Sequence, residues 1–172
     1  NLAEEYKIKN LCLAGGVALN CVANGKILKE KIFKDIWIQP ASGDAGGSLG
    51  AALAYWYREL DNPRNDFKDQ MKGSYLGPSL NEKEIESQLK ELKAVFKKKD
   101  SNQIISITAK ELSNSKTVGW FQGRMEFGPR ALGGRSILGD PRSELMQKNL
   151  NLKIKFRESF RPFAPSILRE DL

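Results

Sequence analysis

Histidine is absent from this chain of 172 residues, and cysteine occurs only twice, at Cys12 and Cys21. Without histidine, the chain alone cannot build a Ser-His-Asp triad or a histidine-based zinc site. We interpret the two cysteines as small core residues of a protein in the reducing cytoplasm. No uninterrupted apolar stretch approaches the length of a membrane span, and no signal-peptide pattern begins the chain. We therefore expect a cytoplasmic protein without a membrane partner.

An initiator methionine is also missing, since the chain begins at Asn1, and we interpret the sequence as a segment of a longer protein. What the sequence has in excess is positive charge: 28 Lys and Arg residues face 21 Asp and Glu residues, which gives a net charge of +7. This balance favours anionic partners. It does not by itself distinguish nucleic acid, a membrane surface and small phosphorylated ligands.

The first part of the chain alternates short apolar runs with glycine-rich turns. We expect strands at residues 10–14 and 35–40, each followed by a glycine-rich turn and a helix. The first helix should cover residues 17–30, and the second should begin after residue 43. This order predicts an α/β fold. The inner face of the second helix would carry Leu49, Leu53, Trp56 and Leu60.

The second part begins after an irregular segment, residues 61–79, whose prolines and glycines are typical of a connection between domains. Asn81 and Glu84 have the spacing of a capping box at the start of an amphipathic helix. We then expect a short strand at residues 104–107 and a short helix at residues 108–115. A buried strand should follow at residues 117–121, and Met146, Leu150 and Ile154 share one helical face.

Two groups of cations flank that helical face. Arg124, Arg130 and Arg135 lie among the glycines of the stretch Gly119–Pro141, which we expect to be a strand end and a loop. The second group comprises Lys153, Lys155, Arg157 and Arg161. Arginine matches phosphate or carboxylate oxygens with a planar fork of donors, so the loop is a candidate anion site that could stabilise charge on a leaving pyrophosphate. The alternative is a surface loop whose arginines are only solvated.

The two glycine-rich turns are a second candidate site. The first contains Gly15, Gly16 and Asn20, and the second contains Gly43, Asp44, Gly46 and Gly47. Each turn follows an expected strand and opens a helix, where free backbone N–H groups attract phosphate. Asp44 could hold a hard metal ion or polarise a hydroxyl. The alternative is two tight turns with Asp44 as a helix N-cap.

These motifs resemble those of the O-carbamoyltransferases of nodulation-factor and antibiotic biosynthesis. The similar stretches read LAGGVALN, QPASGDAGGSLGAAL, GWFQGRMEFGPRALGGRSIL and IKFRESFRPFAPSIL, and the likeness covers nearly the whole chain. The arginine motif and RPFAPS are the specific ones. The resemblance implies that residues 1–71 form the C-terminal part of a Kae1-like domain of the actin/Hsp70 ATPase type. Residues 72–172 would be the first part of a YrdC-like α/β domain.

The resemblance also implies a reaction. Members of the family use ATP and carbamoyl phosphate to form carbamoyl-adenylate, and then pass the carbamoyl group to a hydroxyl of a small-molecule acceptor. The residues that match the carbamoyl phosphate and nucleotide site are Arg124, Lys155 and Arg161, which we expect to converge on one phosphate-sized hollow. Arg130 and Arg135 would be ligand contacts or loop anchors.

The resemblance assigns the first site as well. Asp44 matches a metal-binding aspartate, and Gly15, Gly16 and Asn20 match a nucleotide-binding turn beside it. In the family two histidines complete this metal site, and the ion would be Fe²⁺ or Mg²⁺. This sequence contains no histidine. We therefore expect the chain, taken alone, to be catalytically silent.

Two other functions stay open. The basic charge would permit an RNA-binding or tRNA-modification module with a YrdC-like fold, although we expect no nucleic acid partner. The glycine turns alone would permit a non-catalytic ATP-binding piece. Neither the acceptor nor the oligomeric state follows from the sequence.

Overall fold

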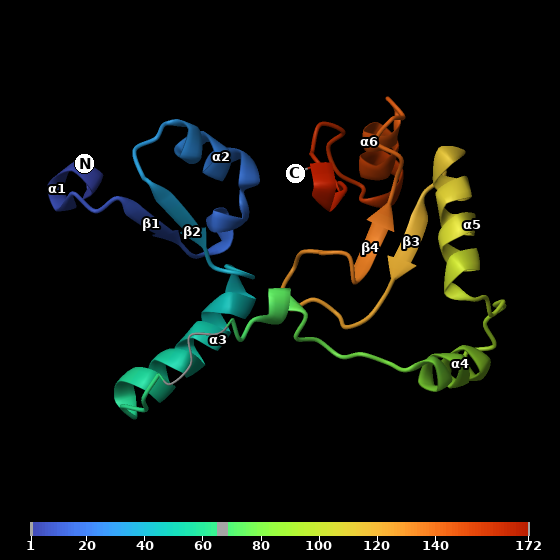
Figure 1. Ribbon diagram of the computed structural model, residues 1–172, viewed down its shortest axis with the longest axis horizontal. Coiled ribbons are helices and arrows are strands. Elements are labelled where there is room, and N and C mark those ends of the chain that lie inside the picture. Colours follow the sequence, from blue (N-terminus) through green and yellow to red (C-terminus); the bar gives the residue numbers. More distant parts are fainter. Residues whose placement is uncertain (1, 65–68, 172) are drawn as a thin grey trace. The chain divides into compact units, whose positions relative to one another are not determined.

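The computed structural model describes residues 2–64 and 69–171 (Figure 1). The chain divides into two compact units. Unit 1 takes in residues 1–79 together with Gly123–Gly134, and unit 2 takes in Leu80–Gln122 together with Arg135–Leu172. The resemblance implies a domain boundary between residues 71 and 72. The two compact units do not test that boundary, so it remains a prediction.

Unit 1 contains a parallel pair of strands with helices after each strand (Figure 1). Its elements are α1 (Leu2–Tyr6), β1 (Asn10–Leu13), a 3-10 helix (Gly16–Leu19), α2 (Cys21–Lys29), β2 (Asp35–Ile38), α3 (Asp44–Ala54), a π-helical turn (Tyr55–Glu59) and a 3-10 turn (Lys72–Ser74). Leu11 pairs with Ile36, and Leu13 pairs with Ile38. The two expected strands are confirmed, as is the mixed α/β character of the chain.

The first expected helix, at residues 17–30, begins later as an α-helix than the sequence predicts. Asn20 is the N-cap of α2, and its side-chain oxygen accepts a hydrogen bond from the backbone N–H of Ala23 at 3.1 Å. Asparagine satisfies a free N–H of the first turn in this way, so the α-helix starts at Cys21. The residues before it form the 3-10 helix.

Unit 2 contains an antiparallel hairpin, and α5 lies beside its first strand (Figure 1). The elements are α4 (Glu82–Glu91), α5 (Ser101–Ser113), β3 (Val118–Phe121), β4 (Arg135–Leu138), α6 (Met146–Asn149), a π-helical turn (Leu150–Ile154) and a 3-10 turn (Arg169–Asp171). The capping box of Asn81 and Glu84 is present at the start of α4. Trp120 pairs with Ser136 across the hairpin.

The strand expected at residues 104–107 is wrong, because these residues lie inside α5. Asp100 caps that helix by accepting a hydrogen bond from the N–H of Gln103 at 2.9 Å. The N-cap at Asp100 starts α5 before the apolar residues 104–107, so these residues continue the helix. Arg135 also differs from expectation, since it begins β4 instead of lying in a loop.

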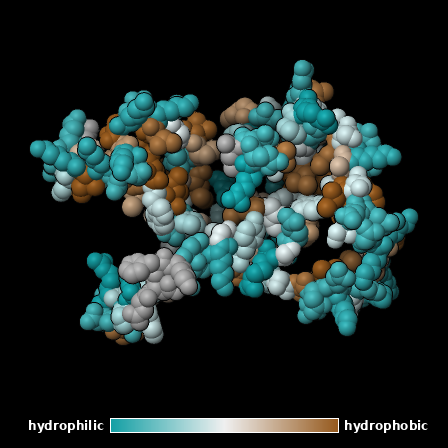
Figure 2. All heavy atoms as spheres, viewed as in Figure 1, coloured by the Kyte–Doolittle hydropathy of each residue, from teal (hydrophilic) through white to brown (hydrophobic). Residues whose placement is uncertain are grey.

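The described part of the chain buries few large apolar side chains. The buried apolar residues are Ala18, Met146 and Leu150. Figure 2 shows hydrophobic residues, in brown, at the surface of the viewed face. Within the described residues, no helix is both long enough and apolar enough to cross a membrane.

The expectation that both cysteines are core residues is wrong, because Cys12 and Cys21 are exposed. Side chains alternate along β1, and it is Leu11 and Leu13 that face inward there. Leu53, Trp56 and Leu60 are also largely exposed, with 44%, 50% and 49% of their surface accessible. Leu49 is half-buried, so among the described residues the expected inner face of the second helix is only partly covered.

Candidate functional site

The two glycine-rich turns of unit 1 lie against each other. The backbone N–H of Gly15 donates to the carbonyl oxygen of Ser42 at 2.7 Å, and a Cβ on Gly43 would lie 4.0 Å from the Cα of Gly16. Gly15 has a φ of 97°, which side chains rarely allow. Parallel strands place the turns that follow them at the same edge, so β1 and β2 bring the turns together.

The glycines at the start of α3 have different surroundings. Gly46 is buried, and a Cβ there would lie 2.4 Å from the carbonyl oxygen of Ala41. Its N–H also donates to that oxygen, at 2.7 Å. Gly47, in contrast, would accept a Cβ without contact. Gly46 therefore lets the turn pack closely on the helix, and its N–H is already used.

Asp44 is the first residue of α3, and its side chain is exposed. The described residues contain no group of three or more His, Cys, Asp or Glu side chains that could hold a metal ion. A hard cation needs several oxygen ligands. Asp44 is a single carboxylate, so the described residues do not by themselves form a metal site.

The arginine loop (Gly123–Gly134) belongs to the same unit and packs on the second glycine turn. Gly128 has a φ of 103°, and a Cβ on it would lie 2.5 Å from the Cβ of Ala41. The unit thus brings three segments together that are far apart in the sequence. These are the turns at Gly15 and Gly43 and the loop that carries Arg124 and Arg130.

Backbone hydrogen bonds attach the arginine loop to residues 74–78. The N–H of Phe127 donates to Ser74 at 2.6 Å, the N–H of Met125 donates to Pro78 at 2.9 Å, and the N–H of Gly77 donates to Met125 at 2.9 Å. The hydroxyl of Tyr75 donates to the carbonyl oxygen of Leu132. Such ties reduce the freedom of a loop that contains many glycines.

A buried carboxylate forms hydrogen bonds with the backbone of its own loop. Glu126 is only 9% exposed and accepts hydrogen bonds from the backbone N–H groups of Leu132 and Gly134, at 2.7 Å each. No role of its own was predicted for Glu126 from the sequence. An acidic residue placed between the arginines of a glycine-rich loop was the available signal. The side chains of Arg124 and Arg130 are exposed.

Arg135, the last arginine of the motif, has the contacts of a hairpin anchor. Its guanidinium donates to the carbonyl oxygen of Gln122 at 3.2 Å and lies over the ring of Phe121, 5.3 Å from the ring centroid. Both contacts tie the start of β4 to the end of β3. Of the two roles left open for Arg135, these contacts favour that of an anchor.

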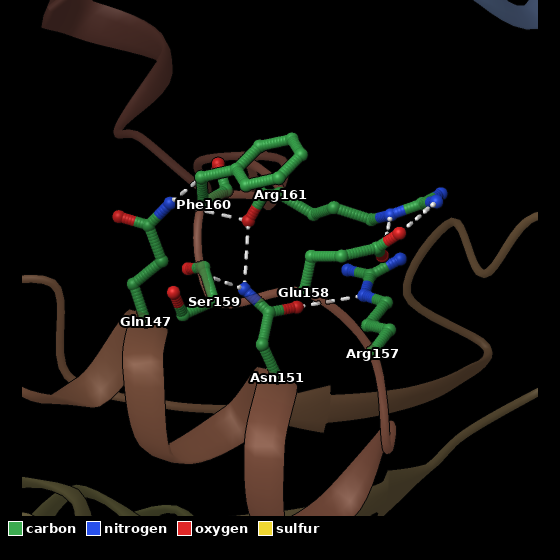
Figure 3. Close-up of polar contacts among 7 residues, drawn as sticks. All are labelled: Gln147, Asn151, Arg157, Glu158, Ser159, Phe160 and Arg161. Atoms are coloured by element: carbon green, nitrogen blue, oxygen red, sulfur yellow. Dashed lines mark hydrogen bonds and ion pairs between the residues drawn. The ribbon is translucent and has the colours of Figure 1, made fainter.

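The second group of cations begins at Lys153, inside the π-helical turn of unit 2, and continues in the segment Lys155–Arg161. Two side-chain amides hold this segment (Figure 3). Asn151 donates to the carbonyl oxygens of Ser159 at 3.1 Å and Arg161 at 2.9 Å, and it accepts from Nε of Arg157 at 2.6 Å. Gln147 donates to Phe160 at 3.2 Å and Arg161 at 3.1 Å. Neither amide was predicted from the sequence.

The guanidinium of Arg161 forms an ion pair with Glu158. Nε lies 2.7 Å from Oε2, and the terminal nitrogen lies 3.3 Å from Oε1 (Figure 3). The hydrogen bond from Arg161 lowers the pKa of the Glu158 carboxyl below its usual value. Glu158 in turn raises the pKa of Arg161. Both side chains and that of Lys155 are exposed, so an anion from solution can reach the two cations.

The predicted cations are divided between the compact units. Arg124 and Arg130 belong to unit 1, and Arg135, Lys155 and Arg161 belong to unit 2. The expected convergence of Arg124, Lys155 and Arg161 on one hollow remains a prediction. Unit 2 has an open hollow of about 320 Å³ whose lining includes Lys153 of the second cation group and none of Arg135, Lys155 and Arg161. It is lined by Ser115, Lys116, Thr117, Met146, Asn149, Lys153 and Ile154.

Comparison with known families gives a match at both ends of the chain. The family described as the carbamoyltransferase N-terminus matches residues 1–53, and the family described as the carbamoyltransferase C-terminus matches residues 109–172. The first range contains both glycine turns. The second contains the arginine loop and the segment Lys155–Arg161.

Several proteins are similar to nearly the whole chain. An uncharacterized protein from Synechocystis is 60% identical over 97% of this chain and 28% of its own length. Nodulation protein NolO of Bradyrhizobium diazoefficiens is 48% identical over 94% of this chain and 29% of its own length. Nodulation protein NolNO of Sinorhizobium fredii is 44% identical over 95% of this chain and 24% of its own length. The chain thus spans less than a third of each relative, and it belongs to the carbamoyltransferase family.

Proposed function

We propose that this chain is part of an ATP-dependent O-carbamoyltransferase. In the proposed reaction carbamoyl phosphate, ATP and water give carbamoyl-adenylate, pyrophosphate and phosphate, and the carbamoyl group then passes to a hydroxyl of a small-molecule acceptor. The observation that carries the proposal is the double family match, which covers the glycine turns at one end and the cationic residues at the other. ATP and carbamoyl phosphate are made inside cells, so the proposal places the reaction in the cytoplasm.

The proposed roles of the cations follow from their chemistry. Arg124, Lys155 and Arg161 would bind the phosphate oxygens of carbamoyl phosphate and ATP, because guanidinium and ammonium groups form strong hydrogen bonds with such oxygens. Holding both phosphates makes the encounter of the two substrates effectively intramolecular. The same cations would stabilise the charge that builds on the leaving pyrophosphate. Their exposure supports the proposal, since a ligand can reach them.

The glycine turns would bind the nucleotide. Gly15 and Gly16 have no atoms that a Cβ would meet within 4 Å, so open space adjoins the backbone there. This leaves room for a phosphate to approach the turn, where the N–H of Gly15 already donates to Ser42 and other backbone N–H groups would bind the phosphate. Asn20 uses its side-chain oxygen to cap α2, and its amide N–H groups have the right character to donate to a nucleotide. Gly43 and Gly47 would complete the turn, whereas Gly46 would hold it in place.

The fold assignment is also part of the proposal. Residues 1–71, which contain the parallel strands and their following helices, would be part of a Kae1-like domain, and residues 72–172 would be part of a YrdC-like domain. In the family a divalent ion, Fe²⁺ or Mg²⁺, would act as a Lewis acid beside Asp44. The described residues contain no group of three or more His, Cys, Asp or Glu side chains around such an ion, so it would need ligands from elsewhere.

The experiment that tests the function measures pyrophosphate release by the full-length protein that contains this sequence. We expect release only when ATP and carbamoyl phosphate are both present. Arg124→Ala, Lys155→Ala and Arg161→Ala should each reduce it by roughly ten-fold or more, because each removes a charge-assisted hydrogen bond. Arg169→Ala is the matched control and should leave it unchanged. Release that does not depend on carbamoyl phosphate would contradict the proposal.

The same set of variants separates the proposal from RNA binding. An RNA-binding module would show salt-sensitive affinity for RNA that is indifferent to sequence and survives Arg124→Ala. A non-catalytic ATP-binding piece would bind ATP and show no response to carbamoyl phosphate. The 172-residue chain alone should bind ligands without transferring the carbamoyl group.

A further inference from the structure

We propose that Asn151 and Gln147 are positioning residues that fix the backbone of Arg161, so that its guanidinium meets the phosphate of carbamoyl phosphate. The inference rests on the proposed function, because it assigns a support to one of the proposed phosphate-binding residues. Neither amide touches the substrate in this account. Both act through the place that they give to Arg161 (Figure 3).

Asn151 has the contacts of a support. It is fully buried, with 0% of its surface exposed, and it has the largest fully buried side chain in the described chain. Its amide nitrogen donates two hydrogen bonds, and its oxygen accepts one from Arg157. A buried amide is costly unless it is hydrogen-bonded, and here both ends of the amide are used. All the partners lie in the segment that carries Arg161.

Gln147 lies four residues before Asn151, so the two side chains leave the same face of the helical turns. Figure 3 shows both amides directed toward the loop above the helix. Together they donate to the carbonyl oxygens of Ser159, Phe160 and Arg161. The carbonyl oxygen of Arg161 receives a hydrogen bond from each of them.

The segment needs such support because regular structure does not supply it. Residues 155–168 belong to no helix or strand. Within the turn itself, the N–H of Arg161 donates to Glu158 at the long distance of 3.3 Å. Two prolines, Pro162 and Pro165, follow and offer no backbone N–H. The amides of Asn151 and Gln147 therefore donate the backbone hydrogen bonds that a neighbouring strand would otherwise supply.

This arrangement fixes the backbone of Arg161 and leaves its guanidinium able to exchange one ion-pair partner for another. The guanidinium is exposed and pairs with Glu158, whose carboxylate a phosphate oxygen can replace. Because the backbone of Arg161 is already held in place, little conformational entropy is lost when the ligand binds. Loss of the two amides would let the backbone of Arg161 move, and binding of carbamoyl phosphate would weaken.

The test compares variants of the full-length protein by steady-state kinetics of pyrophosphate release. Gln147→Ala removes two hydrogen bonds from an exposed residue, and Asn151→Asp replaces the donating nitrogen with an oxygen of the same size. A positioning role predicts that Gln147→Ala raises KM for carbamoyl phosphate by roughly five-fold or more, with the melting temperature nearly unchanged. Lys148→Ala, an exposed neighbour in α6, is the control and should match the wild type.

A merely structural role predicts a different pattern. In that case Gln147→Ala would lower the melting temperature or kcat through loss of active protein, and KM for carbamoyl phosphate would equal that of the wild type. That result overturns the inference, and it does so even if Asn151→Asp fails to fold. If Arg161→Ala raises KM and Gln147→Ala does not, the proposed function stands and only this inference fails. If the wild type releases no pyrophosphate in response to carbamoyl phosphate, both fail.

Discussion

The carboxylate of Glu126 accepts a hydrogen bond from the backbone N–H of Gly134 at 2.7 Å, across the arginine loop. A second hydrogen bond, from the N–H of Leu132, reaches the same oxygen atom at the same distance. The acidic residue of this basic loop is thus structural. It does not simply reduce the local charge, because it closes the backbone around itself and holds the stretch that carries Arg130.

Replacing Glu126 with alanine should therefore destabilise the loop. Two backbone donors would lose their acceptor, and that of Gly134 is buried. We expect the free energy of unfolding to fall by about 2–3 kcal/mol, which is the usual cost of leaving buried donors unsatisfied. Chemical denaturation measures it. Glu144→Ala removes an exposed carboxylate and should change the value by less than about 0.5 kcal/mol. Equal values for the two variants would refute the structural role of Glu126.

The contact between Gly128 and Ala41 predicts a second effect. An alanine at position 128 would have to adopt a φ of 103°, with its Cβ 2.5 Å from that of Ala41. We expect Gly128→Ala to lower the free energy of unfolding by roughly 2 kcal/mol or more, from backbone strain and overlap together. Gly25→Ala, in the interior of α2 with open space around it, should instead stabilise by up to about 1 kcal/mol. Two variants that behave alike would contradict the close packing.

The ion pair of Asp140 and Arg142 predicts a dependence on pH. Hydrogen bonds from the side chain of Arg142 lower the pKa of Asp140 from 3.8 to about 2. Because the folded pKa lies below the unfolded one, the pair stabilises the fold above about pH 4 and loses this contribution as the pH falls to 2. Unfolding measured between pH 5 and pH 2 should show the gap between wild type and Asp140→Asn closing. A gap that is constant with pH would rule out the pair as its source.

The ion pair of Glu158 and Arg161 predicts a gain of affinity. Glu158 occupies the guanidinium in the absence of ligand, and its negative charge repels a phosphate. Glu158→Gln should therefore tighten the binding of carbamoyl phosphate to the full-length protein, by roughly two- to five-fold as expected for an exposed pair. Calorimetric titration measures this, with Glu170→Gln as the control. Weaker binding by Glu158→Gln would mean that Glu158 helps to hold the ligand.

The sequence was most informative where the structure is local. The strands before each glycine turn and the capping box of α4 follow from patterns of a few residues, and all are present. The strand expected at residues 104–107 failed because a short apolar run fits either a strand or a helix. The deciding signal was Asp100, a good N-cap that the apolar run obscured. The glycine-rich pattern does not predict β4, because these residues form a strand only through their pairing with β3.

The candidate site divides in the same way. Residue types and the resemblance identified the cations and the glycine turns. The supports of the site, Glu126 and Asn151, were not identified, because their partners are backbone groups several residues away. Backbone acceptors and donors are the same for every residue type, so no sequence pattern reveals them. The exposure of Cys12 had a local cause in the alternation of β1, but small residues fit either face.

The most direct test of the account is a calorimetric titration of the full-length protein with carbamoyl phosphate. We predict saturable binding that the double variant Lys155→Ala/Arg161→Ala weakens by at least roughly ten-fold, as loss of two charge-assisted hydrogen bonds implies. Arg169→Ala, which removes an exposed arginine from the same unit, should bind like the wild type. If the double variant binds carbamoyl phosphate as tightly as the wild type, these cations do not hold its phosphate and the account is wrong.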